Sequence, residues 1–126
     1  MIHGIGMDIV EVARIQKAIR RFGDRLAQRI LTGAEWEEYQ RAGARARFLA
    51  RRFAVKEALV KALGTGFSDG LAPRQIGVIH DHLGRPGLSC DGPARDRLAA
   101  LGIGNSHLSI TDEREYAAAV VVLERS

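Results

Sequence analysis

The sequence of 126 residues is poor in several residue types, and each shortage excludes a class of protein. Cys90 is the only cysteine, so the chain has neither an internal disulfide nor a cysteine-rich zinc site. Aromatic residues make up 6% of the chain, which argues against a stacking platform for single-stranded nucleic acid. No apolar run approaches the ~20 residues of a membrane span, and the apolar start MIHGIGMDIV lacks the basic leader and cleavage site of a signal peptide. We therefore expect a cytoplasmic protein without a membrane partner.

The remaining composition is that of an ordinary globular protein. Apolar residues make up 46% of the chain, which is enough for a core, and charged residues make up 27%. A chain of this length fits a single domain, and we expect it to cover residues 1–126.

Basic residues are concentrated in the N-terminal half of the chain. The formal net charge is +4. The segment 14–29 contains six basic residues and one acidic residue, and the segment 41–61 contains seven and one. A field of this sign attracts acidic proteins, phosphates or nucleic acid. The alternative is a basic surface that is merely solvated.

The periodicity of apolar residues predicts an α+β fold with a largely antiparallel sheet. Thr32 and Glu35 have the spacing of a capping box, and Gly23, Gly64 and Gly66 fit helix ends. The predicted strands cover residues 2–10, 76–79, 88–90, 107–111 and 116–123, and the predicted helices cover about residues 12–22, 32–39, 44–63 and 93–101.

The two faces of the predicted first strand differ in kind. One face carries Ile5, Met7 and Ile9, and the other carries Gly4, Gly6 and Asp8. Since the two glycines leave their face without side chains, another part of the protein can approach the backbone there.

Residues 48–63 do not follow the pattern of an ordinary surface helix. When they are placed on a helix at about 100° per residue, Arg52 and Lys56 fall inside an arc of large apolar residues. The other side is a strip of small residues: Ala50, Ala54, Ala58 and Ala62. We therefore expect both sides to be packed, and the two enclosed charges to be partly buried and to have partners. The alternative for Lys56 is an ammonium that reaches out of the apolar arc into solvent.

Glu57 and Lys61 lie at positions i and i+4 of the same helix. One interpretation is a surface ion pair worth ~0.3–0.5 kcal/mol. The other is a carboxylate that holds magnesium with lysines beside bound phosphates, since magnesium prefers one or two carboxylates plus substrate oxygens. Asp8 is the candidate for the second carboxylate, and a helix cap or a surface turn is its alternative role. Spacing alone does not bring Asp8 to Glu57.

Two segments carry a resemblance to a known family. GMDIVEVARI, from Gly6 to Ile15, resembles the pattern G-x-D-x-x-x-x-x-R-I of the holo-acyl-carrier-protein synthase family, a group of small 4'-phosphopantetheinyl transferases. FAVKEALVKALG, from Phe53 to Gly64, resembles that family's pattern F-x-x-K-E-A-x-x-K-A-x-G. LGRP and HLSIT are also similar to family segments, so the resemblance spans nearly the whole chain.

The resemblance implies a reaction and a set of site residues. A serine hydroxyl of apo-acyl carrier protein would attack the β-phosphate of coenzyme A, giving holo-carrier for fatty acid biosynthesis and adenosine 3',5'-bisphosphate. Asp8 and Glu57 would hold magnesium, and Glu57 and Lys61 would be catalytic, with the general base left open between Glu57 and a metal-bound water. The implied coenzyme A residues are Arg52, Lys56, Lys61, Gly64, Pro86 and His107. The implied residues for the acidic carrier are Arg14, Lys17, Arg21 and Arg25.

The resemblance also implies a homotrimer. Short members of the family pack their antiparallel sheets, with helices on them, around a threefold axis. Asp8 and Glu57 would come from one subunit, and the LGRP turn and the HLSIT strand would cover coenzyme A from the next. Asp112 departs from the family pattern, which usually has a histidine after HLSIT. An acid there would either repel phosphates or point to solvent in the turn DERE.

Three other functions stay open on the sequence. The basic half would also suit a nucleic-acid-binding module without catalysis, although no nucleic-acid motif is present and we expect no nucleic-acid partner. Asp8 and Glu57 would also suit a magnesium-dependent phosphohydrolase. Asp112 would also suit a family member that has lost activity.

Overall fold

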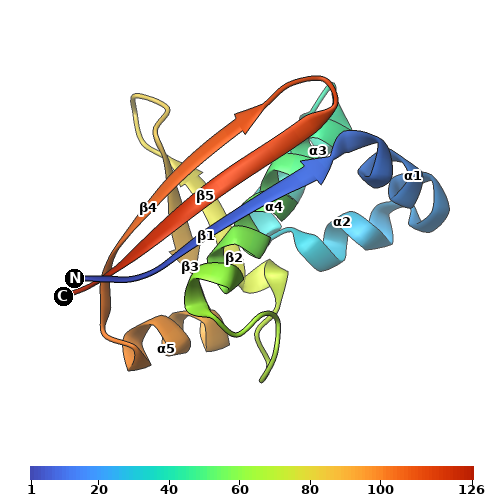
Figure 1. Ribbon diagram of the computed structural model, residues 1–126. Coiled ribbons are helices and arrows are strands. Elements are labelled where there is room, and N and C mark those ends of the chain that lie inside the picture. The colour runs from blue at the N-terminus through green and yellow to red at the C-terminus, as the bar shows by residue number, and fades with distance from the viewer.

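The computed structural model describes all of residues 1–126 and shows an α+β fold (Figure 1). The predicted strands and helices are all present, with one helix added. In chain order the elements are β1 (Ile2–Glu11), α1 (Val12–Phe22), α2 (Asp24–Ile30), α3 (Gly33–Arg41), α4 (Arg45–Leu63), a 3-10 turn (Pro73–Gln75), β2 (Ile76–His80), β3 (Pro86–Cys90), α5 (Gly92–Ala100), β4 (Ile103–Asp112) and β5 (Tyr116–Arg125).

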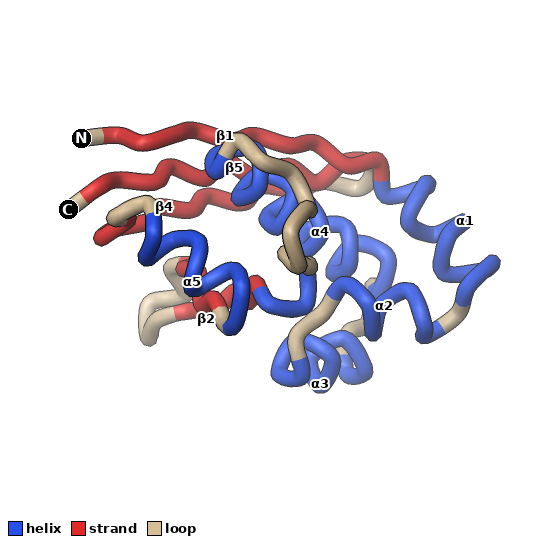
Figure 2. Tube along the Cα trace, turned by 90° about the horizontal axis from the view of Figure 1, so that it is seen from below, coloured by secondary structure: helices blue, strands red, loops and turns tan.

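The strands form two antiparallel sheets. The larger has the order β1-β5-β4, and the smaller is the hairpin of β2 and β3. The N- and C-terminal strands are therefore neighbours, with Met7 opposite Val120 and Asp8 opposite Ala119. Seen from below, the three-stranded sheet forms one layer, and the helices and the small hairpin lie on one side of it (Figure 2).

α4 covers the inner face of this sheet at very short range. A Cβ atom added to Gly6 would lie 1.8 Å from the carbonyl oxygen of Ala58, and one added to Gly4 would lie 2.1 Å from that of Ala62. These distances confirm both sequence interpretations, because the side-chain-free face of β1 lies directly against the alanine strip of α4. The contact fixes Asp8, on the same strand, beside the second half of α4.

The outer face of the larger sheet is apolar along β1 and β5 and open in the single chain. Ile5, Met7 and Ile9 are 61%, 68% and 65% exposed. Their partners on β5 include Val122 and Val120, which are only partly buried, whereas Ala119 and Val121, which alternate with them, are buried. The alternation shows that one face of the sheet belongs to the core and the other does not.

Local sequence signals determine where two of the helices begin or end. α3 starts with a complete capping box, in which the Thr32 hydroxyl accepts from the Glu35 N–H and the Glu35 carboxylate accepts from the Thr32 N–H. α4 ends at Gly64, whose φ of 84° is left-handed and suits glycine. No helix has the length and apolar character needed to cross a membrane.

Candidate active site

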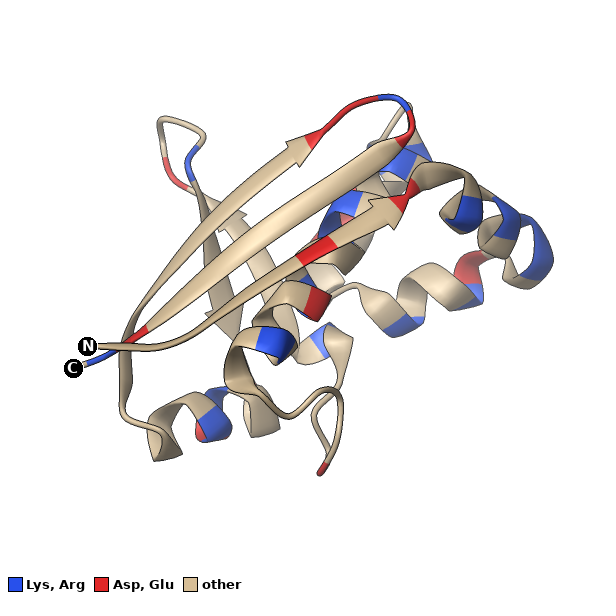
Figure 3. Cartoon of the chain, in the orientation of Figure 1, with Lys and Arg blue, Asp and Glu red and all other residues tan.

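The predicted metal residues Asp8 and Glu57 share one cavity. It has a volume of about 270 Å³ and lies between β1, α1 and α4. Its lining consists of Asp8, Ile9, Val10, Arg14, Ile15, Phe53 and Glu57. Figure 3 shows acidic positions on β1 and α4 near one another, with basic positions along α1. The fold therefore brings together two carboxylates whose proximity could not be predicted from their spacing in the sequence.

Lys61, one turn after Glu57 on α4, pairs with Asp8. Its ammonium donates to Asp8 Oδ1 at 2.9 Å and to the Met7 carbonyl oxygen at 3.1 Å. Its side chain is 53% exposed, so the ammonium is accessible to a ligand. Lys61 thus pairs with Asp8 on the neighbouring strand as well as lying one turn from Glu57.

The electrostatics of the cavity favour a cation. Burial raises the pKa of the Glu57 carboxyl above 4.5, the negative charge of Asp8 raises it further, and Lys61 opposes the shift. A positive ion between the two carboxylates would relieve this repulsion. Two carboxylates with room for ligand oxygens is the donor set that magnesium prefers, so the residues present fit that metal.

A larger cavity of about 500 Å³ lies at the start of α1 beside the β4–β5 turn. Its charged residues are Glu11, Arg114 and Glu115, and it contains none of the residues that the sequence predicted for the site. Chemistry rather than size therefore identifies the smaller cavity as the candidate site.

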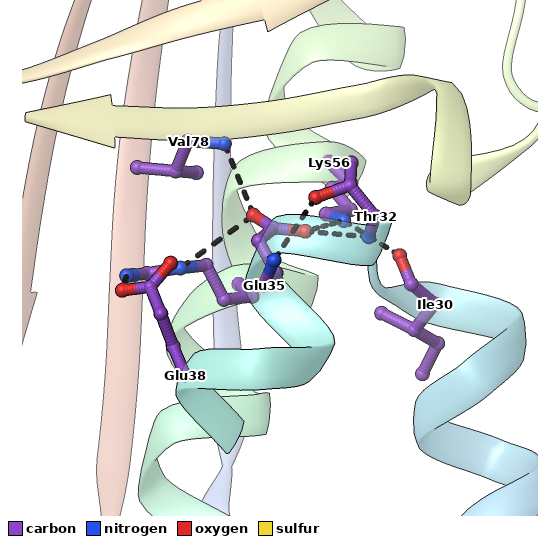
Figure 4. Close-up of polar contacts among 7 residues, drawn as sticks. Ile30, Thr32, Glu35, Glu38, Lys56 and Val78 are labelled. Carbon is purple, nitrogen blue, oxygen red and sulfur yellow. Dashed lines mark hydrogen bonds and ion pairs between the residues drawn. The ribbon is translucent and has the colours of Figure 1, made fainter. Parts of the chain in front are cut away.

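The structure contradicts the prediction that Lys56 and Arg52 bind coenzyme A. Lys56 is 0% exposed, and its ammonium donates to Glu35 Oε1 and to the Ile30 carbonyl oxygen, both at 2.6 Å (Figure 4). Arg52 is 4% exposed and forms ion pairs with Glu35 at 3.6 Å and Glu38 at 3.7 Å. Neither cation has a free surface for phosphate. The expectation that these charges are buried and paired is confirmed, and the alternative of a solvent-reaching Lys56 is wrong.

Sequence reasoning missed Glu35 as the partner of both cations. It assigned Glu35 to the capping box, a local role that the structure confirms and that already accounts for a glutamate at this position. Glu35 lies 21 positions from Lys56 in the sequence, on a different helix. The only available signal was that Arg52 and Lys56 required an acidic partner somewhere.

Asp112 lies at the end of β4 and pairs with two arginines of α4. Its Oδ2 is 3.0 Å from an Arg47 nitrogen and 3.3 Å from an Arg51 nitrogen. The sequence left two alternatives for Asp112, repulsion of phosphates or a side chain that points to solvent. The second is wrong, because the carboxylate is held against α4. It is not among the residues that line the cavity of Asp8 and Glu57.

Three further predicted residues lie outside the cavity in the single chain. Gly64 ends α4 after Lys61, and Pro86 starts β3. His107 lies on β4 opposite Val122, on the far side of β5 from β1, and its ring contacts Glu124. One chain alone therefore does not bring Pro86 and His107 to Asp8.

The predicted carrier residues lie on the first two helices, whose basic positions Figure 3 shows in blue, and we call them together the basic surface. Arg14, Lys17 and Arg21 are exposed on α1, and Arg25 is exposed on α2. Arg14 also lines the cavity, so the basic surface is continuous with the candidate site. Ile15, on the same helix, is buried.

Comparisons with known proteins agree with this geometry. Residues 4–121 match the family model described as the 4'-phosphopantetheinyl transferase superfamily. A holo-[acyl-carrier-protein] synthase of Halorhodospira halophila is 54% identical over 98% of both chains. The crystal structure of the Neisseria meningitidis holo-[acyl-carrier-protein] synthase superposes with a TM-score of 0.92 at 44% identity, covering 99% of this chain and 100% of that one. A Bacillus anthracis structure, 38% identical with a TM-score of 0.83, covers 100% of this chain and 99% of its own and is described as a complex with CoA (3',5'-ADP).

Proposed function

This chain belongs to the holo-[acyl-carrier-protein] synthase family of the 4'-phosphopantetheinyl transferase superfamily, and we propose that it modifies an apo-acyl carrier protein. It transfers 4'-phosphopantetheine from coenzyme A to a serine of the carrier and releases adenosine 3',5'-bisphosphate. The observation that carries this proposal is the cavity in which Asp8 and Glu57 meet, with Lys61 and Arg14 at its edge.

Phosphoryl transfer depends on positioning and charge neutralisation more than on covalent help. The serine oxygen forms a bond to the β-phosphorus of coenzyme A while the bond to the bridging oxygen breaks, and that oxygen leaves with adenosine 3',5'-bisphosphate. Asp8 and Glu57 would hold magnesium, which when bound neutralises the pyrophosphate and the leaving group. Lys61 donates from its exposed ammonium to a phosphate oxygen and positions it.

The serine proton needs an acceptor, and Glu57 is the residue of the cavity best suited to this role. Its carboxylate lines the cavity that adjoins the basic surface of α1. A water bound to the metal would be the alternative acceptor. Arg14, at the edge of the cavity, directs an acidic carrier toward it.

The basic surface of α1 and α2 suits an acidic carrier protein. Lys17, Arg21 and Arg25 are exposed next to Arg14. Charges of this kind mainly speed encounter, and their effect weakens as salt screens them. The carrier thus meets the basic surface first and presents its serine to the adjoining cavity.

Coenzyme A requires more residues than one chain brings together, and we infer a homotrimer for this reason. Lys61 and Gly64 belong to the subunit that carries Asp8, while Pro86 and His107 belong to its neighbour. The open apolar face of the sheet supports such an assembly, because Ile5, Met7 and Ile9 are all more than half exposed in the single chain. The proposed reaction belongs to fatty acid biosynthesis in the cytoplasm.

Intact mass spectrometry of an apo-acyl carrier protein tests the proposed function. The carrier is incubated with coenzyme A, magnesium and this protein, and in parallel with Glu57→Ala and with a chelator. We expect a gain of one phosphopantetheine with the wild-type protein, and no gain with the variant or the chelator. Glu37→Ala is the matched control, because Glu37 is an exposed glutamate on α3 outside the cavity. No gain with the wild-type protein across several carriers would overturn the proposal.

A further inference from the structure

α4 is buried on almost every side, so its apolar pattern constrains its rotation less closely than the pattern of a surface helix does. Of its 19 residues, 13 are buried. In its second half, the residues left partly open form a single stripe of Phe53, Glu57 and Lys61. An ordinary amphipathic helix has one apolar face that decides which way it turns. α4 has apolar or small residues on nearly all of its sides. A further contact is therefore needed to set the final rotation that directs its open stripe toward Asp8.

The contact with β1 fixes the distance of α4 from the sheet more than its rotation. Ala58 and Ala62 meet Gly4 and Gly6, so backbone lies against backbone. Large side chains of α4 have no room against the two glycines, but alanine and glycine have no long side chains to interlock, so the contact tolerates small rotations of the helix. The close approach therefore leaves the final position of Glu57 around the helix axis to be set by other contacts.

The cluster of Glu35, Lys56 and Arg52 on the opposite side of α4 is directional. Both oxygens of Glu35 are occupied, since Oε1 accepts from Lys56 Nζ at 2.6 Å and from the Thr32 N–H at 3.0 Å, and Oε2 accepts from the Val78 N–H at 3.0 Å. Figure 4 shows the carboxylate between the start of α3, the strand β2 and the side chains of α4. The Ile30 carbonyl oxygen holds the same ammonium from α2. Lys56 thus meets acceptors on α2 and α3, while Val78 fixes Glu35 from β2.

Stability alone gives little reason for this cluster. Glu35 is 1% exposed and Lys56 is 0% exposed. Removing two charges from water costs several kcal/mol per ion, and replacing a buried ion pair with apolar residues of similar size is often neutral or stabilising. What a buried ion pair adds is a preferred arrangement, because a rotation that separated Lys56 from Glu35 would leave the ammonium unpaired in the core.

We propose that Lys56 and Glu35 form a positioning pair that sets the rotation of α4 and thereby turns Glu57 and Lys61 toward Asp8. Lys56 and Glu57 are adjacent residues and point about 100° apart around the helix axis. With Lys56 held between α2 and α3, Glu57 faces the cavity and Lys61 reaches Asp8. A rotation that released Lys56 would carry Glu57 away from Asp8. The effect of this pair on activity, unlike its effect on the rotation of α4, rests on the proposed transfer reaction.

The double variant Glu35→Gln/Lys56→Met tests the pair. It removes both charges at nearly constant volume, and glutamine can still serve in a capping box. We expect it to fold with reduced stability in urea, because Arg52 keeps only Glu38 as a partner, while its crystal structure shows α4 rotated and the contact between Lys61 and Asp8 lost. We expect kcat to fall at least about tenfold, since small misplacements at a reacting centre have effects of this size or larger. The KM for the carrier should stay nearly constant, because the basic surface of α1 is unchanged.

Val60→Ala is the control for a loss of stability without a loss of charge. Val60 is 2% exposed on the same helix and makes no polar side-chain contact. At a temperature where it is folded, it should lower stability but keep kcat and the position of α4. If the double variant does not fold, Lys56→Met alone gives the same two readouts, since Glu35 keeps Arg52 and the N–H groups of Thr32 and Val78 as partners.

The outcomes separate this inference from the proposed function. A variant that retains the wild-type position of α4, or the wild-type kcat, overturns the positioning role. If the wild-type protein transfers no phosphopantetheine, the proposed function fails, while the position of α4 in the variant still decides whether the pair sets its rotation.

Discussion

Glu57 combines two requirements that oppose each other within one carboxyl group. A metal site needs the carboxylate ionised and near Asp8, whereas folding would be easier without that repulsion. Burial and Asp8 raise its pKa above 4.5 in the folded chain. The folded state therefore binds a proton more tightly than the unfolded state. The resulting stabilisation is complete below the unfolded pKa and is lost as the pH rises through the folded pKa.

Glu57→Gln should make the metal-free protein more stable and inactive. Near neutral pH we expect its free energy of unfolding to exceed that of the wild type by up to about 1 kcal/mol, the scale of partly exposed charge interactions. The difference should vanish below the ordinary carboxyl value of 4.5. Phosphopantetheine transfer should fall at least about a hundredfold, because a bound metal supplies several kcal/mol and each 1.36 kcal/mol is tenfold. Urea unfolding across this pH range and the carrier mass assay measure the two effects. A difference in stability that grows toward acid pH would contradict the argument.

Lys56 and Glu57 also show which features of single residues can be predicted from the sequence and which cannot. Lys56 and Glu57 are neighbours in one motif, yet Glu57 faces a cavity and Lys56 faces the core. The sequence placed Lys56 among large apolar residues, and this correctly predicted its burial. It could not supply Glu35, because the partner of a buried charge is selected by tertiary packing and not by spacing. The site roles of Asp8, Glu57 and Lys61 stay predictions, although the structure brings these three residues together.

At the scale of elements, short sequence signals at helix ends predicted the secondary structure most reliably. The capping box at Thr32 and the glycine at position 64 were both read correctly, since each satisfies backbone groups within a few residues. α2 was missed. It has only seven residues, follows Gly23 directly and has no side-chain cap. Its place in the fold comes from packing, with Ala27 and Ile30 buried, rather than from a local signal.

The contact between β1 and α4 leads to a prediction at this scale. Gly6→Ala would place a Cβ atom 1.8 Å from the Ala58 carbonyl oxygen, which is part of a helix backbone and cannot turn aside. We expect a loss of about 3 kcal/mol or more, the upper end of overpacking effects, measured by urea unfolding. Transfer activity should also fall, because the strand that carries Asp8 must move away from α4.

Gly33→Ala is the matched control for this substitution. A Cβ atom at Gly33 would meet nothing within 4 Å, and the residue is the first of α3. Alanine there should stabilise the protein by up to about 1 kcal/mol, since glycine is the poorer helix residue. Equal effects at the two positions would show that the close approach of β1 and α4 is not what requires Gly6.

At the scale of the whole molecule, the single chain leaves an apolar part of its larger sheet uncovered. Its inner face lies against α4, and its outer face presents Ile5, Met7 and Ile9 from β1 beside Val120 and Val122 from β5. A contiguous apolar surface of this kind marks an interface. The proposed coenzyme A residues His107 and Pro86 lie outside the cavity of their own chain, which is what shared sites between subunits would produce.

Met7→Glu should therefore separate the subunits and abolish transfer while leaving each chain folded. Met7 is 68% exposed, so the substitution should change the stability of the isolated chain by no more than about 0.5 kcal/mol. In a closed assembly, however, the threefold axis would bring several unpaired carboxylates into an apolar contact. Light scattering after size exclusion should give a trimer for the wild type and a monomer for the variant. Phe22→Glu, which adds the same charge at a 53% exposed apolar residue on α1, should stay trimeric and lose affinity for the carrier instead. A Met7→Glu protein that remains trimeric would move the interface to another surface, and one that is monomeric but fully active would place the complete coenzyme A site within a single chain.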